Sequence, residues 1–170
     1  MSGGGPRGLE RLAQRAGARL SDNNQGGLVA SFINHRTWIV QWGQCDPAGV
    51  VFNSRFFEVF DQSTWLLFEA ALGVKAHELS KTFDIFGIPL VDARANFLKP
   101  AKFGDVIEIA SRVAEFRRSS FEIEHTLSVN GELAVEGVET RVWAARDKAS
   151  PESFGAVAIP TDVIAKFQAG

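Results

Sequence analysis

The sequence predicts an α+β fold in which one long core helix is wrapped by a curved antiparallel β-sheet of about five strands. The first observation is the stretch 53–73, where apolar side chains recur at helical spacing on nearly every side. The second is a series of four strand-like segments after that stretch, rich in β-branched and aromatic residues. Their connections are short, so neighbouring strands should run antiparallel. A helix this apolar has to be covered, and we expect it to lie against the concave face of the sheet.

Length and composition describe a single domain with no unusual charge. The chain has 170 residues and a formal net charge of −2, which gives no reason to expect nucleic acid or a membrane surface as a partner. No apolar run approaches the roughly 20 residues of a membrane span. A single cysteine excludes an internal disulfide and favours a cytoplasmic location. The histidines are widely spaced, so a structural zinc site is not expected.

Residues 1–34 are expected to form an N-terminal extension, flexible or partly helical, ahead of a folded domain at 35–170. The extension starts with a glycine-rich run and continues with leucines and arginines at helical spacing. Its Arg-rich, acid-poor balance resembles an organelle transit peptide, although a solvated extension is the simpler interpretation.

The core helix should begin near Asn53 and end at Gly73. Asn53 and Ser54 carry side-chain oxygens that can cap free N–H groups, and Gly73 suits the left-handed conformation that ends many helices. Asp61 lies in the middle of the apolar surface, where an unpaired carboxylate is costly to bury. Packing alone therefore does not explain this helix.

The other elements follow from alternation and turn signals. We expect a strand at 36–42 before the helix and a polar connector at 75–83, with room for a helical turn, after it. Four strands should follow, at 87–98, 106–116, 121–129 and 133–145. Asn130-Gly131 is a strong hairpin signal, and Pro160 opens a short amphipathic segment. The strands at 106–116 and 133–145 carry more apolar residues than one helix can bury, so we expect at least a dimer.

Asp46 is the main candidate for a catalytic group. It lies in a tight turn just before the helix N-terminus, whose free N–H groups carry partial positive charge. Such groups can hold the oxygen of a polarised carbonyl while a nearby carboxylate attacks or activates water. The alternative is that Asp46 only stabilises its turn. Cys45 and His125 have no evident catalytic partner in the sequence, and we interpret them as packing or surface residues.

Residues 42–52 (WGQCDPAGVVF), followed by a core helix with Asp61, resemble the 4-hydroxybenzoyl-coenzyme A thioesterase family. Further matches lie at 87–90, 95–97 and 115–121, in the same order, so the similarity covers roughly residues 36–167. The resemblance implies the hotdog fold, in which a curved antiparallel sheet wraps one long helix. It also implies hydrolysis of an acyl-coenzyme A (acyl-CoA), with no metal and no cofactor beyond the coenzyme A of the substrate.

The resemblance assigns roles to individual residues. Asp46 matches the family's catalytic carboxylate, as nucleophile or general base. The backbone N–H of Asn53 matches the group that polarises the thioester carbonyl. Asp61 matches a helix carboxylate that contacts the distal hydroxyl of an aromatic acyl group across a subunit interface.

Four further residues are expected to contact the substrate. Arg117 and Arg118 match a basic pair that meets the coenzyme A phosphates, whereas Phe52 and Gly49 belong to the matched loop. The family also implies a homodimer or homotetramer with its active sites at the interface. Without the resemblance, the two arginines could equally be a solvated strand end.

Two departures from the family leave the acyl group open. Asn53 stands where the family carries Tyr, and Gln44 stands where it carries an acid. A non-catalytic acyl-CoA or acyl-carrier-protein binding module would have much the same sequence. A hotdog dehydratase is the weaker alternative, because no histidine lies in the loop or on the helix.

Overall fold

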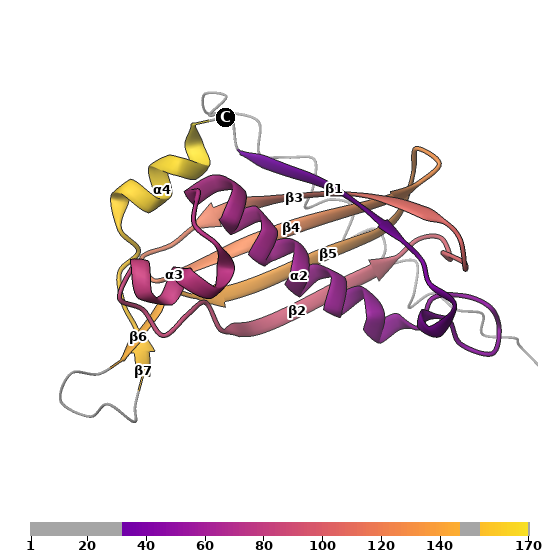
Figure 1. Cartoon of the computed structure of the whole chain (residues 1–170), viewed down its shortest axis with the longest axis horizontal. Coiled ribbons are helices and arrows are strands. Elements are labelled where there is room, and N and C mark those ends of the chain that lie inside the picture. Colours follow the sequence, from indigo (N-terminus) through magenta and orange to yellow (C-terminus); the bar gives the residue numbers. More distant parts are fainter. Residues whose placement is uncertain (1–31, 147–153, 170) are drawn as a thin grey trace, which may run out of the picture.

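A long helix, α2 (Asn53–Leu72), lies across one face of a five-stranded antiparallel sheet (Figure 1). The computed structural model describes residues 32–146 and 154–169. The strands lie in the order β1-β3-β4-β5-β2, and every neighbouring pair is antiparallel. Their bounds are β1 (Ile33–Ile39), β2 (Leu90–Phe97), β3 (Val106–Phe116), β4 (Ser120–Val129) and β5 (Glu132–Val142). The predicted architecture is therefore confirmed.

Several element boundaries differ from the predicted ones. Strand β1 begins three residues before the predicted strand, and the predicted connector contains a full helix, α3 (Ala76–Thr82). The last predicted strand divides at Trp143, after which β6 (Ala144–Arg146) pairs with β7 (Phe154–Ala156). The extension lies outside the described residues up to residue 31, as does most of the predicted loop at 147–154.

The two predicted glycine turns are confirmed. Gly73 ends α2 in the left-handed conformation (φ 68°), and its N–H donates to the carbonyl of Glu69. Asn130 and Gly131 both have positive φ, 52° and 77°, as a two-residue hairpin of type I′ requires. The predicted C-terminal segment is helix α4 (Thr161–Gln168). None of the helices in the described residues is long and apolar enough to cross a membrane.

Helix α2 buries one face only, which corrects the expectation of a helix covered on nearly every side. The buried residues are Phe56, Val59, Phe60, Ser63, Thr64, Leu67 and Phe68. Glu58, Asp61 and Gln62 are exposed on the opposite side. The helix approaches the sheet closely at Gly137, where an added Cβ would lie 2.5 Å from the ring of Phe60. Only glycine leaves room for that ring.

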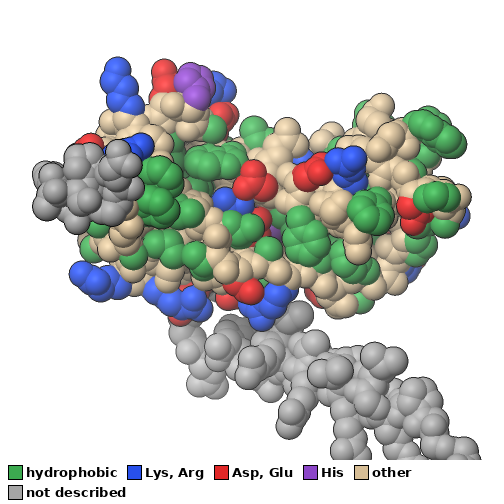
Figure 2. All heavy atoms as spheres, turned by 90° about the horizontal axis from the view of Figure 1, so that it is seen from below, with side chains coloured by type: hydrophobic (Ala, Val, Ile, Leu, Met, Phe, Trp, Pro, Cys, Tyr) green, Lys and Arg blue, Asp and Glu red, His purple; other side chains and the backbone are tan. Residues whose placement is uncertain are grey.

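The free edge at β2 is apolar. Leu90, Val91 and Phe97 are exposed on this strand, and Leu98 is exposed just after it. Figure 2 shows hydrophobic side chains gathered on the side of the molecule where β2 lies in Figure 1. An apolar edge strand with unpaired backbone groups is a ready template for pairing with another strand.

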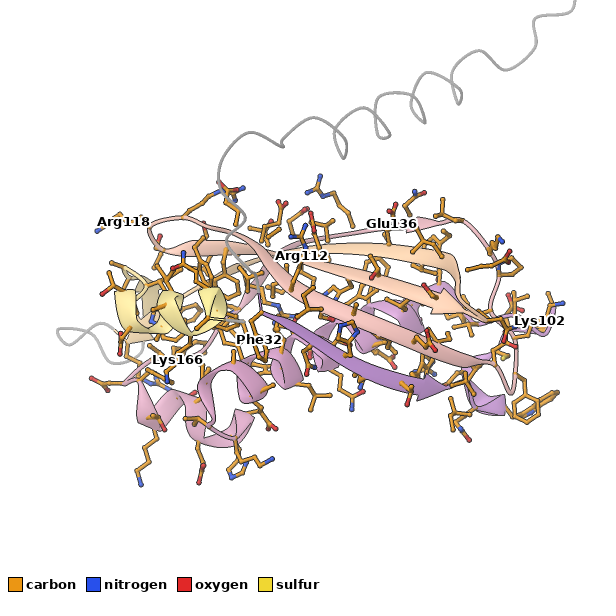
Figure 3. The ribbon with its side chains drawn as sticks, turned by 90° about the horizontal axis from the view of Figure 1, so that it is seen from above. Phe32, Lys102, Arg112, Arg118, Glu136 and Lys166 are labelled. Carbon is orange, nitrogen blue, oxygen red and sulfur yellow. The ribbon has the colours of Figure 1, made fainter. Side chains whose placement is uncertain are left out.

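The sheet face away from α2 carries both charged and apolar side chains. The buried apolar residues of β3 and β5 face α2, whereas Arg112 and Glu136 lie on the other side (Figure 3), which by alternation also carries the half-buried Val138 and Val142. Arg112 forms an ion pair with Glu124 there at 2.6 Å. Alternation therefore turns only some of the apolar residues of β3 and β5 to the helix side, and the predicted dimer stays a prediction.

Candidate active site

The loop between β1 and α2 holds Asp46 in a closed turn. The carbonyl of Asp46 accepts the N–H of Gly49 at 2.9 Å, and its own N–H donates to Val50 at 2.8 Å. Carboxylate oxygen Oδ1 accepts the N–H of Ala48 at 2.8 Å. Gly49 has φ 77°, a conformation that favours glycine. Asp46 therefore does stabilise its turn, yet its Oδ2 forms no hydrogen bond with the described part of the chain.

Helix α2 starts at the end of this loop with donors that are unpaired in the described residues. Its N-cap residue is Phe52, so Asn53 and Ser54 are already helical and their side chains do not cap it, contrary to the sequence prediction. The Phe52 N–H donates to Gln44, and the Phe52 carbonyl accepts the N–H of Arg55. The N–H groups of Asn53 and Ser54 donate to no acceptor in the described residues. They remain available to a ligand, with the positive end of the helix dipole behind them.

A cavity of about 280 Å³ opens beside these donors. It lies between the start of α2, the end of β2 and the segment that follows β2. Lys99 is its only charged lining residue; the others are Val50, Val51, Asn53, Phe56, Phe97, Leu98, Pro100 and Ala101. An apolar cavity with N–H donors at its wall suits an apolar group that carries a carbonyl.

Asp61 lies two turns along α2 and is not a buried acid. Its side chain is 54% exposed, and Oδ1 accepts a hydrogen bond of 2.6 Å from Nη2 of Arg141. The predicted cost of burying this carboxylate therefore does not arise in the single chain. The partner, Arg141 on β5, was not predicted from the sequence.

Behind Arg141 lies a buried polar cluster that connects β5, β4, β3 and α2. Glu139 is 1% exposed and binds the Arg141 guanidinium with both oxygens at 3.0 Å. Burial pulls the pKa of Glu139 upward. Hydrogen bonds from His125 and Arg141, the Arg141 charge and a hydrogen bond from Thr64 outweigh it and lower the pKa to about 2.

His125 is part of this cluster rather than a surface residue. Nδ1 lies 2.8 Å from the Ser111 hydroxyl, and Nε2 lies 3.5 Å from both Thr64 and Glu139. The imidazole stacks on the ring of Phe60, with centroids 5.0 Å apart. A Ser-His-Glu arrangement can be catalytic, but these three residues are buried under α2, where no substrate can reach the hydroxyl.

Glu139 and Arg141 could have been found by reading the strand alternation more strictly. They share the inward parity of Val135 and Gly137, so two charges were placed on the core side of one strand. Two inward charges at i and i+2 indicate a buried ion pair.

Arg117 and Arg118 lie at the opposite end of the sheet from Asp46. Ile39, just before the Asp46 loop, pairs with Val106 at the start of β3, whereas the arginines follow its end. Ten residues of strand span about 33 Å. Figure 3 shows Arg118 at one end and Lys102, which pairs with Val50 of the Asp46 loop, at the other. One chain therefore does not bring the predicted site residues together.

The remaining predicted site residues lie in the loop. Phe52 and Gly49 are both exposed beside the start of α2. Arg117, at the other end of the sheet, is exposed and pairs with Glu115 at 2.6 Å.

Within residues 32–146 and 154–169, no three His, Cys, Asp or Glu side chains cluster in a way that could hold a metal ion.

Comparison with known proteins identifies the family to which the chain belongs. Residues 40–167 match the thioesterase-like superfamily. The chain belongs to this superfamily. The matched region spans every element of the described fold except β1, and the superfamily carries the thioester hydrolysis that the sequence predicted.

Two enzymes are similar to this chain over much of its length. The 4-hydroxybenzoyl-CoA thioesterase of Pseudomonas sp. strain CBS-3 is 28% identical over 74% of this chain and 90% of that protein. Its structure aligns with a TM-score of 0.72 and 27% identity, covering 79% of this chain and 98% of that one. A 1,4-dihydroxy-2-naphthoyl-CoA hydrolase of Prochlorococcus marinus is 30% identical over 58% of this chain and 70% of that protein.

These similarities confirm the predicted family and the hotdog fold. A further solved structure is an aspartate-to-asparagine variant of 4-hydroxybenzoyl-CoA thioesterase in complex with 4-hydroxybenzoyl-CoA. It is 26% identical, with a TM-score of 0.72, over 79% of this chain and 98% of that one. A thioesterase of this fold thus binds an aryl-CoA as a complete ligand.

Proposed function

We propose that the protein hydrolyses an aryl-CoA or a related acyl-CoA to the free acid and coenzyme A. The observation that carries this proposal is a carboxylate, Asp46, in the loop that leads into α2, where the N–H groups of Asn53 and Ser54 are unpaired and Asn53 lines an apolar cavity. A carboxylate and an oxyanion-binding helix terminus are the two groups that thioester hydrolysis without a metal requires.

The chemistry follows from these two groups. The thioester carbonyl oxygen accepts the N–H of Asn53, so the negative charge that develops on it is stabilised at the helix N-terminus. Asp46 then either attacks the carbonyl carbon through its free oxygen or removes a proton from the attacking water. If Asp46 attacks, coenzyme A leaves as the thiolate and the acyl group is held on Asp46 as a mixed anhydride, which water then hydrolyses to the acid and free Asp46. If Asp46 acts as the base, the attacking water bonds to the carbonyl carbon and the thiolate is expelled directly. Each route consumes one water and releases the carboxylic acid and coenzyme A.

A second copy of the chain supplies the coenzyme A contacts in this proposal. Strand β2 is the exposed apolar edge, and its Phe97 end lies at the cavity beside Asn53. Its Leu90 end pairs with Arg141, at the end of the sheet that carries Arg117 and Arg118. Two β2 edges that pair antiparallel about a two-fold axis therefore bring the arginine end of one protomer toward the Asp46 end of its partner.

Such pairing accounts for the separation seen in a single chain. Arg117 and Arg118 of one protomer then hold the coenzyme A phosphates, since guanidinium groups suit phosphate oxygens. The acyl end of the substrate enters the site of the other protomer. Further pairing of dimers into a tetramer, and a cytoplasmic location, belong to the same proposal.

The acyl group is proposed to be aromatic and hydroxylated. The names of the similar enzymes describe 4-hydroxybenzoyl and 1,4-dihydroxy-2-naphthoyl groups, both hydroxylated aromatic acids. Asp61 presents a half-exposed carboxylate that can accept a hydrogen bond from such a hydroxyl. Asn53 stands where the resembled family carries Tyr, and the smaller side chain leaves more space at the start of the helix.

The two alternatives predict different results. A dehydratase needs a histidine in its site, but His125 is buried under α2, away from the Asp46 loop. A non-catalytic binding module would bind acyl-CoA without turnover. The test is a thiol-release assay with aryl-CoA and fatty acyl-CoA substrates of graded size. We expect the largest kcat/KM on hydroxylated aryl-CoA, whereas binding without thiol release on every substrate would refute the proposal.

A further inference from the structure

Arg141 makes an unusually complete set of contacts for a residue outside the Asp46 loop. It is 2% exposed, and its guanidinium donates to both oxygens of Glu139 at 3.0 Å and to the carbonyl of Ile88 at 3.2 Å. One further hydrogen bond, of 2.6 Å, leaves the core from Nη2 to Oδ1 of Asp61. Because Glu139 and the Ile88 carbonyl hold the Arg141 guanidinium, its orientation toward the half-exposed carboxylate of Asp61 is fixed.

Glu139, which holds Arg141, is itself held by polar partners in the core. Oε2 of Glu139 accepts the hydroxyl of Thr64 at 2.6 Å, and His125 lies 3.5 Å from the same oxygen. Ser111 lies 2.8 Å from the other ring nitrogen of His125. The Nε2–H tautomer satisfies this arrangement, because an ionised Glu139 can only accept and Nδ1 then accepts from the Ser111 hydroxyl. Every member of the cluster therefore has one orientation.

Stability alone is a weak reason for such a cluster. A buried ion pair is often replaced by apolar residues of similar volume without loss of stability. The cluster instead controls one group near the surface, Asp61, of which Oδ1 is occupied and Oδ2 makes no hydrogen bond to the described residues. The contact fixes the carboxylate and leaves one oxygen for a ligand.

We infer that Arg141 is a positioning residue that sets acyl-group specificity by holding Asp61 with one carboxylate oxygen free. This inference rests on the proposed thioesterase function. The free oxygen accepts a hydrogen bond from an acyl group with a distal hydroxyl, and it disfavours an acyl group that ends in a carboxylate because like charges repel. Glu139 is the second positioning residue, because it holds Arg141 from behind.

The test compares two substrates that differ only in the distal hydroxyl, 4-hydroxybenzoyl-CoA and benzoyl-CoA. The variant carries Glu139→Gln and Arg141→Met together, so that no unpaired charge is left in the core. The matched control carries Glu124→Gln and Arg112→Met, which remove an ion pair of the same kind on the outer face. For each protein the readout is the ratio of kcat/KM on the two substrates.

We expect the wild type and the control to favour 4-hydroxybenzoyl-CoA, and the Glu139/Arg141 variant to lose about tenfold of that preference. Asp61→Asn should lose a similar amount, and adding it to the variant should cost little more, since the residues act as one unit. Arg141→Lys, which keeps the charge but not the planar fork, should fall between if the double variant fails to fold.

Three results would overturn the inference. An equal loss of kcat/KM on both substrates would show that Arg141 serves the fold only. Hydrolysis by the wild type with no preference for the hydroxyl would refute the inference while leaving the thioesterase function intact. Absence of thiol release from every acyl-CoA would remove the proposed function and this inference with it.

Discussion

The hydroxyl of Thr64, in the middle of helix α2, donates a hydrogen bond of 2.6 Å to the carboxylate of Glu139 on strand β5. This bond joins the two layers of the fold at a point where both residues are buried. It also belongs to the cluster that ends at Asp61, so the orientation of α2 and the proposed acyl contact at Asp61 are set together. If Asp61 contacts the acyl group as proposed, helix packing and that contact depend on the same hydrogen bonds.

Acid should destabilise the protein through Glu139. Its pKa is lowered from 4.5 to about 2 in the folded state. The ionised carboxylate thus stabilises the fold above about pH 4.5, and this stabilisation is lost as the pH falls toward 2. The difference corresponds to roughly 3 kcal/mol of unfolding free energy. Urea unfolding at a series of pH values measures it.

Two variants make this test specific. Glu139→Gln should be less stable than the wild type at pH 7 and should lose less stability between pH 4.5 and 2. Glu124→Gln, on the outer face, should keep the decline of the wild type. An unchanged decline in the Glu139 variant would mean that other carboxylates account for the acid sensitivity.

Arg117 and Arg118 should affect binding more than turnover. Replacing both by Ala removes charge-assisted hydrogen bonds, each worth roughly 1.5–3 kcal/mol, although solvent exposure reduces this. Phosphate contacts are equal in the ground and transition states, so KM should rise about tenfold or more with little change in kcat. The effect should shrink at high salt, where exposed charges are screened.

A truncated substrate separates ligand binding from folding. A pantetheine thioester lacks the nucleotide phosphates, so the double variant and the wild type should hydrolyse it equally well. Equal losses on the truncated and complete substrates would show that the arginine pair supports the fold or the interface instead.

Mixing two defective proteins tests whether the site is shared between protomers. The Asp46→Asn chain and the Arg117→Ala/Arg118→Ala chain each lack one part of the proposed site. A mixed dimer has one site with both parts intact, so refolding the chains together should restore about a quarter of wild-type kcat/KM. Activity equal to the sum of the two separate proteins, or a stable monomer by light scattering at micromolar concentration, would contradict the shared site.

The parts of this protein that could be predicted depend on local patterns in the sequence. The α2 helix, the hairpin at Asn130-Gly131 and the Asp46 turn depend on residues close in sequence, and each was found. The helix cap was misplaced by one residue, because Asn53 and Ser54 are good capping residues that here begin the helix.

The parts that could not be predicted depend on contacts between distant residues. Asp61 accepts a hydrogen bond from Arg141, which lies 80 residues further along the chain, so the sequence around either residue does not indicate the other as its partner. His125 was interpreted as isolated for the same reason, because its partners lie on three other elements. The predicted dimer stays a prediction, because an interface depends on contacts outside a single chain.

Asp46→Asn is the change that bears most directly on the proposed chemistry. Asparagine keeps the oxygen that accepts the N–H of Ala48, so the turn should survive, but it removes the charge needed to attack or to take a proton. Asp105→Asn is a matched control, since Asp105 also accepts a backbone N–H in its turn, that of Lys102 at 2.8 Å. It lies outside the proposed machinery.

The decisive measurement is the rate of thiol release from the best acyl-CoA substrate, together with the melting temperature, for these two variants and the wild type. We predict that Asp46→Asn lowers kcat by roughly 10²–10⁴-fold with an unchanged melting temperature. The Asp105 variant should retain wild-type turnover. Near-normal turnover by a fully folded Asp46→Asn protein would contradict the assignment of Asp46 as the catalytic carboxylate.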